Sequence, residues 1–381
     1  MQRLSSSGSG NCPDIGTRSC TWRPSLPPLL AQALQATGVE RLYSHQAEAI
    51  NAVREGRNVI LATATASGKT LTYNLPVLEA ILEDPEARAL YLFPTKALAQ
   101  DQLRSLQELT TPLGEVPMGT YDGDTPQSVR TSLRRRARIL LTNPDMLSLG
   151  ILPNHTLWSS FLSHLKFVVL DEAHVYRGIF GSQVACVLRR LWRLCHFYGA
   201  SPQVILCSAT IANPGEHAQR LTGQPVQVVD EDGAPQGPRL FALWNPPYLD
   251  KAHTTLRSPN SEATFLFAAL VRAGLRSIVF TRTRRVAELI LRYARQALEP
   301  YAPDLARRIK AYRAGYRPEY RRQLEQELFH GHLLGVTATS ALELGIDVGD
   351  LDVAVLVGYP GSIASLWQRV GRAGRRREGG L

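Results

Sequence analysis

A short run of small and hydroxylated residues with one lysine, at positions 65–70, has the composition of a phosphate-binding loop. The apolar run 58–64 before it is typical of a strand, and the residues after it favour a helix. A tight loop that opens a helix presents backbone N–H groups and the positive end of the helix dipole to phosphate oxygens. Lys69 would add a positive charge at the β- and γ-phosphates, and the Thr70 hydroxyl would bind Mg²⁺. Because the full pattern has glycine where Thr63 stands, a chance turn remains the alternative to a nucleoside triphosphate site.

Two acidic residues, Asp171 and Glu172, stand directly after the apolar run 167–170. Carboxylates at the end of a buried strand are costly unless they meet a cation or water. Asp171 therefore suits a ligand that holds Mg²⁺ through water, and Glu172 suits the polarisation of an attacking water molecule. In isolation the pair would be better explained as the acidic cap of the next helix. The phosphate loop upstream favours the Mg²⁺ interpretation.

A pair of arginines near the end of the chain, Arg372 and Arg375, is spaced so that both side chains share one face of a helical turn. The neighbouring residues Gly371, Ala373 and Gly374 are small and allow close approach of the backbone. Such a pair can neutralise charge on a γ-phosphate that another part of the chain supplies. The alternative is a solvated basic patch.

Apolar strand-like runs alternate with helix-length amphipathic segments along most of the chain. The clearest strands are 58–64, 89–93, 139–142, 167–170, 203–207, 277–281, 333–338 and 352–357. The clearest helices are 95–109, 182–195, 284–296 and 318–329. This alternation predicts crossover connections and parallel sheets with helices on both faces, an α/β fold. Ligands of such sheets bind beyond the carboxyl ends of the strands, where the phosphate loop and the acidic pair stand.

A break rich in Gly and Pro at residues 230–247 divides this pattern into two parts. We therefore expect four regions along the chain. They are a flexible N-terminal lead with one short helix over 1–40, a first α/β domain over 41–235, a linker over 236–258, and a second α/β domain, incomplete at its end, over 259–381.

The net charge of +10 is concentrated in one part of the chain. Residues 236–381 carry 22 basic and 13 acidic residues, whereas residues 41–235 carry 18 of each. The excess points to a polyanionic partner of the second domain. Because only 5 of the 43 basic residues are lysine, an arginine bias from genome composition is the alternative.

Composition also excludes several classes of protein. We find no apolar stretch of about 18 residues and no apolar core in the opening residues, so neither a membrane partner nor a secretory signal is expected. The five cysteines are odd in number and form no C-x-x-C pair, which fits reduced thiols of a cytoplasmic protein and makes a zinc site improbable.

Ten motifs in chain order resemble those of the superfamily-two DEAD/DEAH-box helicases. They are YSHQ (43–46), ATASGKT (64–70), PTKAL (94–98), YDGD (121–124), TNPD (142–145), DEAH (171–174), SAT (208–210), VFTRT (279–283), TSALELGID (339–347) and QRVGRAGR (368–375). The resemblance covers residues 41–377 and implies two tandem RecA-like domains with an ATP cleft between them.

The resemblance also implies a role for individual residues. The catalytic set would be Lys69, Asp171, Glu172, Arg372 and Arg375, with Mg²⁺ held by Thr70 and Asp171. ATP would be bound by Gln46, Thr65, Ala66, Ser67, Gly68, Lys69, Thr70, Gly345 and Asp347, with Gln46 reading the adenine. A nucleic-acid strand would be contacted by Thr95, Lys96, Gly123, Thr142, Asn143, Thr281, Arg282 and Thr339. Cleft closure would be coupled to that strand by His174, Ser208, Ala209, Thr210 and Gln368.

Residues 175–182 and 358–365 resemble in particular the bacterial YprA/MrfA-type helicases, relatives of the fungal RecQ-four-like enzymes. That subfamily implies a 3′-to-5′ DNA translocase of DNA repair in the bacterial cytoplasm. It usually continues into a region with four zinc-binding cysteines, so we expect this chain to be part of a longer helicase, with unaided unwinding in question. Two other functions stay open, namely a DEAH-type RNA helicase and an ATP-gated clamp that binds nucleic acid without unwinding it.

Overall fold

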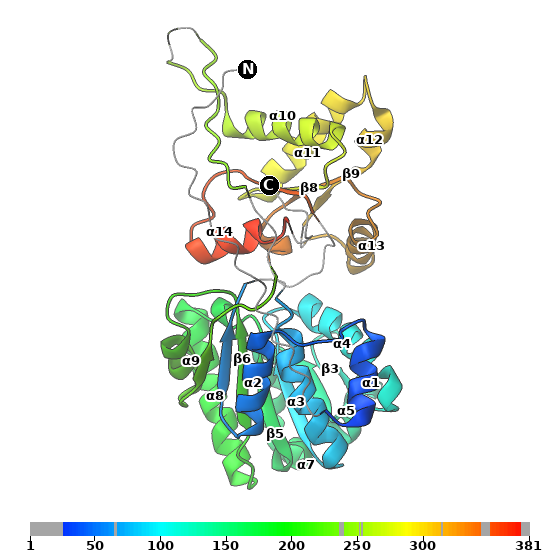
Figure 1. The fold of residues 1–381 in the computed structure, drawn as a ribbon, viewed down its shortest axis with the longest axis vertical. Coiled ribbons are helices and arrows are strands. Elements are labelled where there is room, and N and C mark those ends of the chain that lie inside the picture. Colours follow the sequence, from blue (N-terminus) through cyan, green and yellow to red (C-terminus); the bar gives the residue numbers. More distant parts are fainter. Residues whose placement is uncertain are drawn as a thin grey trace.

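Two α/β domains lie one above the other along the long axis of the computed structural model (Figure 1). The structure describes residues 26–64, 67–235, 240–250, 252, 254–313, 315–343 and 351–374. The first domain, coloured blue to green, precedes residue 235, and the second, coloured yellow to red, begins with helix α10 (Pro259–Arg272).

The first domain is built on a seven-stranded parallel sheet in the order β3-β4-β2-β5-β6-β1-β7. Its strands are β1 (Val59–Ala62), β2 (Arg88–Leu92), β3 (Met118–Thr120), β4 (Ile139–Thr142), β5 (Leu165–Leu170), β6 (Gln203–Ser208) and β7 (Gln227–Val229). Because every pairing is parallel, the carboxyl ends of all seven strands meet at one edge.

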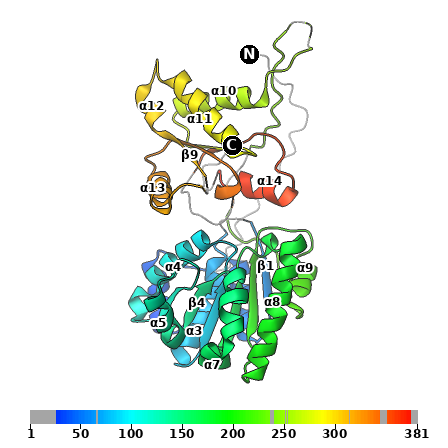
Figure 2. The same cartoon turned by 180° about the vertical axis from the view of Figure 1, so that it is seen from behind.

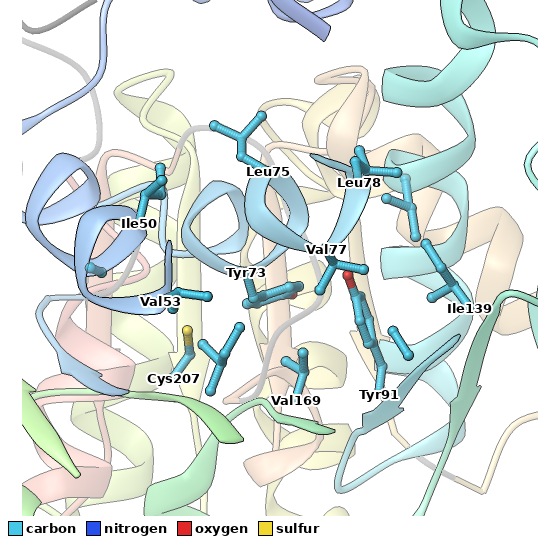
Figure 3. Packing of buried hydrophobic residues seen from close by; sticks show 14 of the residues in the cluster. Ile50, Val53, Tyr73, Leu75, Val77, Leu78, Tyr91, Ile139, Val169 and Cys207 are labelled. Atoms are coloured by element: carbon cyan, nitrogen blue, oxygen red, sulfur yellow. The ribbon is translucent and has the colours of Figure 1, made fainter. Parts of the chain in front are cut away.

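Helices cover both faces of this sheet because successive strand residues point to opposite sides. The helices are α1 (Pro28–Ala36), α2 (Ser44–Arg54), α3 (Thr70–Glu83), α4 (Lys96–Thr110), α5 (Gln127–Arg136), α6 (Pro144–Met146), α7 (Ser159–Ser163), α8 (Gly178–Phe197) and α9 (Pro214–Thr222). In β2, Tyr91 packs into one core cluster, and Leu90 packs into the other. Figure 3 shows the first of these clusters, where Tyr73 and Val77 of α3 pack above Val169 of the sheet. Figure 2 shows α7, α8 and α9 from the other side.

The second domain has a four-stranded parallel sheet in the order β11-β8-β10-β9. Its strands are β8 (Ser277–Phe280), β9 (Ile309–Tyr312), β10 (Gly335–Ala338) and β11 (Val353–Leu356). The helices after α10 are α11 (Arg284–Leu298), α12 (Pro303–Arg307), α13 (Pro318–Phe329) and α14 (Ile363–Val370). As in the first domain, two separate core clusters form around the sheet.

These elements confirm the predicted pair of parallel-sheet α/β domains. The prediction missed β3, β7 and β9, which have only three or four residues each. Within the described residues, no helix combines the length and the apolar composition needed to cross a membrane.

Helix α1 is a short helix within the first 40 residues, where we expected a flexible lead with one short helix. Residues 1–25 lie outside the described residues, but Leu30, Ala33 and Leu34 of α1 are buried in the core cluster on the α2–α3 side of the first sheet. Burial of three apolar side chains anchors this helix. Residues 28–36 are therefore packed on the core of the first domain, and the boundary at residue 40 remains our proposal.

The described residues between β7 and α10 contain no helix and no strand, apart from an isolated antiparallel bridge between Tyr248 and Leu256. The boundaries that we expected for the linker and the two domains remain our proposal.

Candidate functional site

The predicted nucleotide residues converge on three neighbouring strands of the first sheet. The phosphate loop follows β1, the acidic pair follows β5, and the Ser-Ala-Thr motif follows β6. The sheet order β5-β6-β1 places these three carboxyl ends side by side. Thr65 and Ala66 lie outside the described residues.

The described part of the phosphate loop is held by hydrogen bonds of its own. The hydroxyl groups of Thr63 and Ser67 are 2.7 Å apart and buried. Lys69 Nζ donates to the carbonyl oxygens of Thr63 (3.2 Å) and Ala64 (2.6 Å). Helix α3 begins at Thr70, so its first N–H groups face the loop. The loop thus presents a lysine ammonium and a helix N-terminus together, as phosphate binding requires.

Gln46 and Gly68 contact each other closely. Gln46 Nε2 donates to the Gly68 carbonyl at 2.8 Å, while Gln46 Oε1 accepts from the Tyr43 amide at 2.8 Å. Gly68 has a φ of +75°, and a Cβ built there would lie 2.5 Å from Gln46 Nε2. Only glycine fits this position. The Gln46 side chain is thereby fixed against the phosphate loop, where its predicted contact with adenine stays a proposal.

The carboxyl group of Asp171 is buried and lies among oxygen and nitrogen donors. Its Oδ2 accepts from the Tyr73 hydroxyl (3.2 Å), and its Oδ1 accepts from the Glu172 amide (2.8 Å). Burial, with a further contribution from the charge of Glu172, raises the pKa of Asp171 to about 7. A divalent cation would compensate the buried charge. A buried carboxylate beside Lys69 and Thr70 therefore fits a magnesium–nucleotide site.

Glu172 follows this carboxylate in an unusual backbone conformation. It has a φ of +51° and is the one non-glycine residue in the described part of the chain with a positive φ. Its side chain lies at the sheet edge, with Oε2 3.5 Å from His174 Nδ1. Left-handed backbone at a non-glycine residue is costly and clusters at functional sites.

His174 connects three segments of the chain. Its Nδ1 accepts from the Ala209 amide at 3.1 Å, so Nε2 carries the proton. The Gln368 side-chain amide contacts Nε2 and would accept this proton's hydrogen bond through its oxygen. Burial lowers the pKa of His174 to about 4, so the imidazole is neutral at pH 7. Ser208 is buried beside this cluster, and its hydroxyl donates to the Ala209 carbonyl at 2.7 Å, whereas Thr210 is exposed. The contact also shows that this edge of the first sheet faces helix α14 of the second domain.

The arginine motif is held within the second domain by Glu343. The Arg369 guanidinium pairs with the Glu343 carboxylate at 2.9 Å and lies over the Phe280 ring. Arg372 is buried, and its Nη2 donates to the Glu343 carbonyl at 2.6 Å. Arg375, Gly345 and Asp347, which we also predicted to contact ATP, lie outside the described residues.

The predicted strand contacts of the first domain occupy the other half of the same edge. They follow β2, β3 and β4, which are neighbours in the sheet. Lys96 Nζ lies 3.0 Å from Asp124 and close to Gly123, at an exposed turn. The Thr95 and Asn143 side chains cap the helices that follow them (Leu98 N, 3.3 Å; Met146 N, 2.8 Å), and the Thr142 hydroxyl donates to the Tyr121 carbonyl. Thr95, Lys96 and Gly123 are exposed, whereas Thr142 is buried.

In the second domain the predicted strand contacts follow the neighbouring strands β8 and β10. Arg282 is exposed and donates to the Tyr359 carbonyl at 2.8 Å. Thr281 is buried, and its hydroxyl bonds to the Thr283 carbonyl at 3.0 Å. Thr339 is the residue before a short 3₁₀ turn, Ser340–Leu342. Of these three residues, Arg282 is the one whose side chain is exposed to solvent.

Two residues that sequence reasoning did not assign lie against the phosphate loop. They are His45, which precedes the predicted Gln46, and Asp232, in the acidic run before the linker. No spacing or period signals their contact, because Asp232 and Ala64 are 168 positions apart.

Comparison with known proteins gives matches over both domains. Residues 43–217 match the DEAD/DEAH box helicase family, and residues 263–377 match the helicase conserved C-terminal domain. The chain is 46% identical over 370 residues to the uncharacterized ATP-dependent helicase YprA of Bacillus subtilis, which covers 96% of this chain and 49% of YprA. It is 43% identical over 378 residues to the ATP-dependent helicase HRQ1 of Saccharomyces cerevisiae, which covers 97% of this chain and 35% of HRQ1.

Among solved structures, the crystal structure of the DUF1998 helicase MrfA bound to DNA and AMPPNP superposes with a TM-score of 0.91 at 46% identity. That match covers 96% of this chain and 51% of the MrfA chain. The present chain therefore spans about half of the length of YprA and MrfA and about a third of the length of HRQ1.

Proposed function

Because the chain belongs to the DEAD/DEAH-box helicase family, we propose that it is the ATP-hydrolysing motor of a DNA helicase or translocase. The observation that carries this proposal is the convergence of the phosphate loop, the acidic pair and the His174–Gln368 contact. All three meet at the edge of the first sheet that faces the second domain. A nucleotide bound there would touch both domains.

Several residues of the first domain would each have one role in ATP hydrolysis. ATP with Mg²⁺ supplies the phosphoanhydride bond whose hydrolysis provides free energy. Lys69 would leave the carbonyls of Thr63 and Ala64 and bind phosphate oxygens, while Thr70 and Asp171 would hold the metal. Glu172 would orient the attacking water and accept its proton.

Two further groups would act from the second domain and its contact with the first. Arg372, with Arg375, would neutralise charge on the phosphates as the cleft closes. Gln368 and His174 join the arginine motif to the Ser-Ala-Thr motif after β6, so closure of the cleft would reach β6 through Ala209.

A nucleic-acid strand would cross the half of the edge formed by β3, β4 and β2 and continue over β8 and β10. The candidate side chains there are hydroxyls, amides and single cations, which suit phosphate oxygens and carry no base code. Binding should therefore tolerate any sequence and weaken with added salt. We propose DNA as the substrate because MrfA, which is 46% identical to this chain, is described as bound to DNA.

The finer parts of the proposal rest on the same resemblance. They are movement in the 3′-to-5′ direction, a role in DNA repair, and a cytoplasmic location, which also suits the free thiols of Cys186, Cys195 and Cys207.

The test is an ATPase assay of the purified chain alone, with single-stranded DNA and with RNA. We expect stimulation by DNA, and Lys69→Ala should abolish turnover. Stimulation by RNA alone would favour an RNA helicase. Binding of DNA without stimulation of ATPase activity would favour a clamp that does not unwind DNA. This outcome is included because the chain covers 49% of the length of YprA.

A further inference from the structure

The segment that leaves β7 returns to the phosphate loop before it enters the linker. Asp232 Oδ2 accepts a hydrogen bond from the Ala64 amide at 3.1 Å. Its Oδ1 accepts from the Ala234 amide at 3.0 Å, which turns the chain at this point. The carboxylate therefore fixes the backbone of Ala64, near the start of the phosphate loop.

His45 holds the other end of the same loop. The Gly233 amide donates to its Nδ1 at 3.1 Å, so the proton lies on Nε2, which donates to the Ser67 carbonyl at 2.9 Å. The imidazole is almost fully buried, and this burial lowers the pKa of His45. Asp232 Oδ1 lies 3.7 Å from Nδ1, so both anchors of the loop are in contact.

The backbone at Gly233 is packed tightly against the start of α2. A Cβ built at Gly233 would lie 2.0 Å from Ser44 Oγ and 3.1 Å from Ser44 N. The first turn of α2 also carries Gln46, which bonds to Gly68. The segment after β7, the start of α2 and the phosphate loop therefore form one continuous set of contacts.

We propose that His45 and Asp232 are positioning residues that hold the phosphate loop in its nucleotide-binding shape and tie it to the segment leading to the second domain. This inference rests on the proposed function, since it concerns the same ATP site. The hydrogen bonds run from Ala64 to Asp232, along the backbone to Gly233, through His45 and back to Ser67. Neither side chain touches the nucleotide in this scheme.

These hydrogen bonds would raise the affinity of the loop for nucleotide, because they hold the loop in its binding conformation before the nucleotide arrives. A phosphate loop binds only when its N–H groups point toward a common centre, and a free loop must lose conformational entropy to reach that shape. The same hydrogen bonds would also couple the linker to the nucleotide site without involving the cleft between the domains. Displacement of residues 232–233 would remove the hydrogen-bond partners of Ala64 and His45.

The experiment compares Asp232→Ala, Asp232→Asn and His45→Ala with Asp230→Ala in the full chain. Asp230 is exposed, lies two residues away on the same segment, and loses the same charge. Affinity for ADP with Mg²⁺ is measured by calorimetry, and the protection of the Ala64 and Gly233 amides by hydrogen exchange. Thermal unfolding identifies variants that do not fold, in which case the isosteric Asp232→Asn decides.

We expect Asp232→Ala and His45→Ala to weaken ADP binding about tenfold and to lose protection at Ala64 and Gly233. In ATPase assays KM should rise with little change in kcat. Asp232→Asn should fall between, since one carbonyl oxygen remains, and Asp230→Ala should match the wild type.

Two outcomes would overturn the inference while leaving the proposed function intact. One is a folded Asp232→Ala chain that binds ADP like the wild type. The other is equal weakening by Asp230→Ala, which would indicate a general charge effect. A wild-type chain that binds no nucleotide would instead contradict the proposed function itself.

Discussion

The imidazole of His174 and the amide of Gln368 meet in a buried contact although 194 positions of sequence separate them. His174 follows the acidic pair of the first domain, and Gln368 opens the arginine motif of the second. The neutral imidazole uses its second nitrogen to accept from the Ala209 amide, so the two domains share one hydrogen-bonded unit. Loss of either side chain leaves a buried polar partner unsatisfied, which makes the contact sensitive to substitution.

Gln368→Ala should uncouple ATP binding from the stimulation of hydrolysis by DNA. We expect ATP affinity within about twofold of the wild type, since Gln368 contacts His174 and not the phosphate loop, and a loss of about tenfold in DNA-stimulated ATPase activity. Steady-state kinetics with and without DNA measures both. Gln296→Ala, at an exposed position of α11 in the same domain, is the control and should behave like the wild type. Full stimulation in the Gln368 variant would contradict the coupling role.

Glu172→Gln should slow hydrolysis by about 10²-fold or more, because an amide cannot accept the proton of the attacking water. ATP binding should persist, since the phosphate loop and Asp171 are unchanged. Single-turnover hydrolysis and equilibrium binding separate the two effects. A variant that hydrolyses ATP at the wild-type rate would show that another group activates the water.

Asp171→Asn should stabilise the chain when Mg²⁺ and nucleotide are absent. The folded pKa of Asp171, about 7, lies above its ordinary value, so the wild type loses stability as the pH rises from about 4 to 7 and the buried carboxyl ionises. The shift corresponds to at most about 4 kcal/mol. At pH 8 we expect the asparagine variant to melt several degrees higher than the wild type, and at pH 4 to melt at a similar temperature.

Asp171→Asn should also lose the thermal stabilisation that Mg²⁺ and ATP give the wild type, because the carboxylate that we propose to bind Mg²⁺ is absent. Thermal unfolding at both pH values, with and without Mg²⁺ and a non-hydrolysable ATP analogue, measures each effect. A melting temperature at pH 8 that does not exceed that of the wild type would argue against a buried ionised carboxylate.

Lys96→Ala should weaken binding of single-stranded DNA to a similar degree for every sequence and reduce the slope of log K against log salt by about 0.7. Lys166→Ala is a matched control. The two lysine side chains are 45% and 46% exposed, and each pairs with an aspartate, but Lys166 lies near the start of β5, at the opposite edge of the sheet. Fluorescence anisotropy across a salt series measures the slope. An equal effect of both substitutions would place the strand elsewhere.

Sequence patterns predicted the parts of this molecule that depend on neighbours along the chain. The long apolar runs became β2, β4, β5 and β6, and α13 has the predicted bounds, because burial on both faces and helical periodicity are visible locally. Strands β3 and β7, with three residues each, leave too short a pattern.

The contacts of the candidate site also fall into those that the sequence predicts and those that it does not. The motif residues after β1, β5 and β6 could be predicted to meet because parallel strands end at one edge. The contact of His45 with Gly233 could not be predicted, because it depends on how the segment after β7 packs against α2, across 188 positions. The inward orientation of Thr142 also depends on a tertiary contact, its bond to the Tyr121 carbonyl.

The backbone also joins the two halves of the first sheet's edge. The Asp171 amide donates to the Leu92 carbonyl at 3.0 Å, and Leu92 ends the strand that leads to Thr95. The carboxylate that we propose as the magnesium ligand and the first proposed contact with the DNA strand therefore belong to one sheet, so we expect the first domain alone not to move DNA relative to its nucleotide. In the proposed function, a step along DNA would then require a change in the distance between the two domains. A covalent tether between them would leave both ligands bound and the motor stalled.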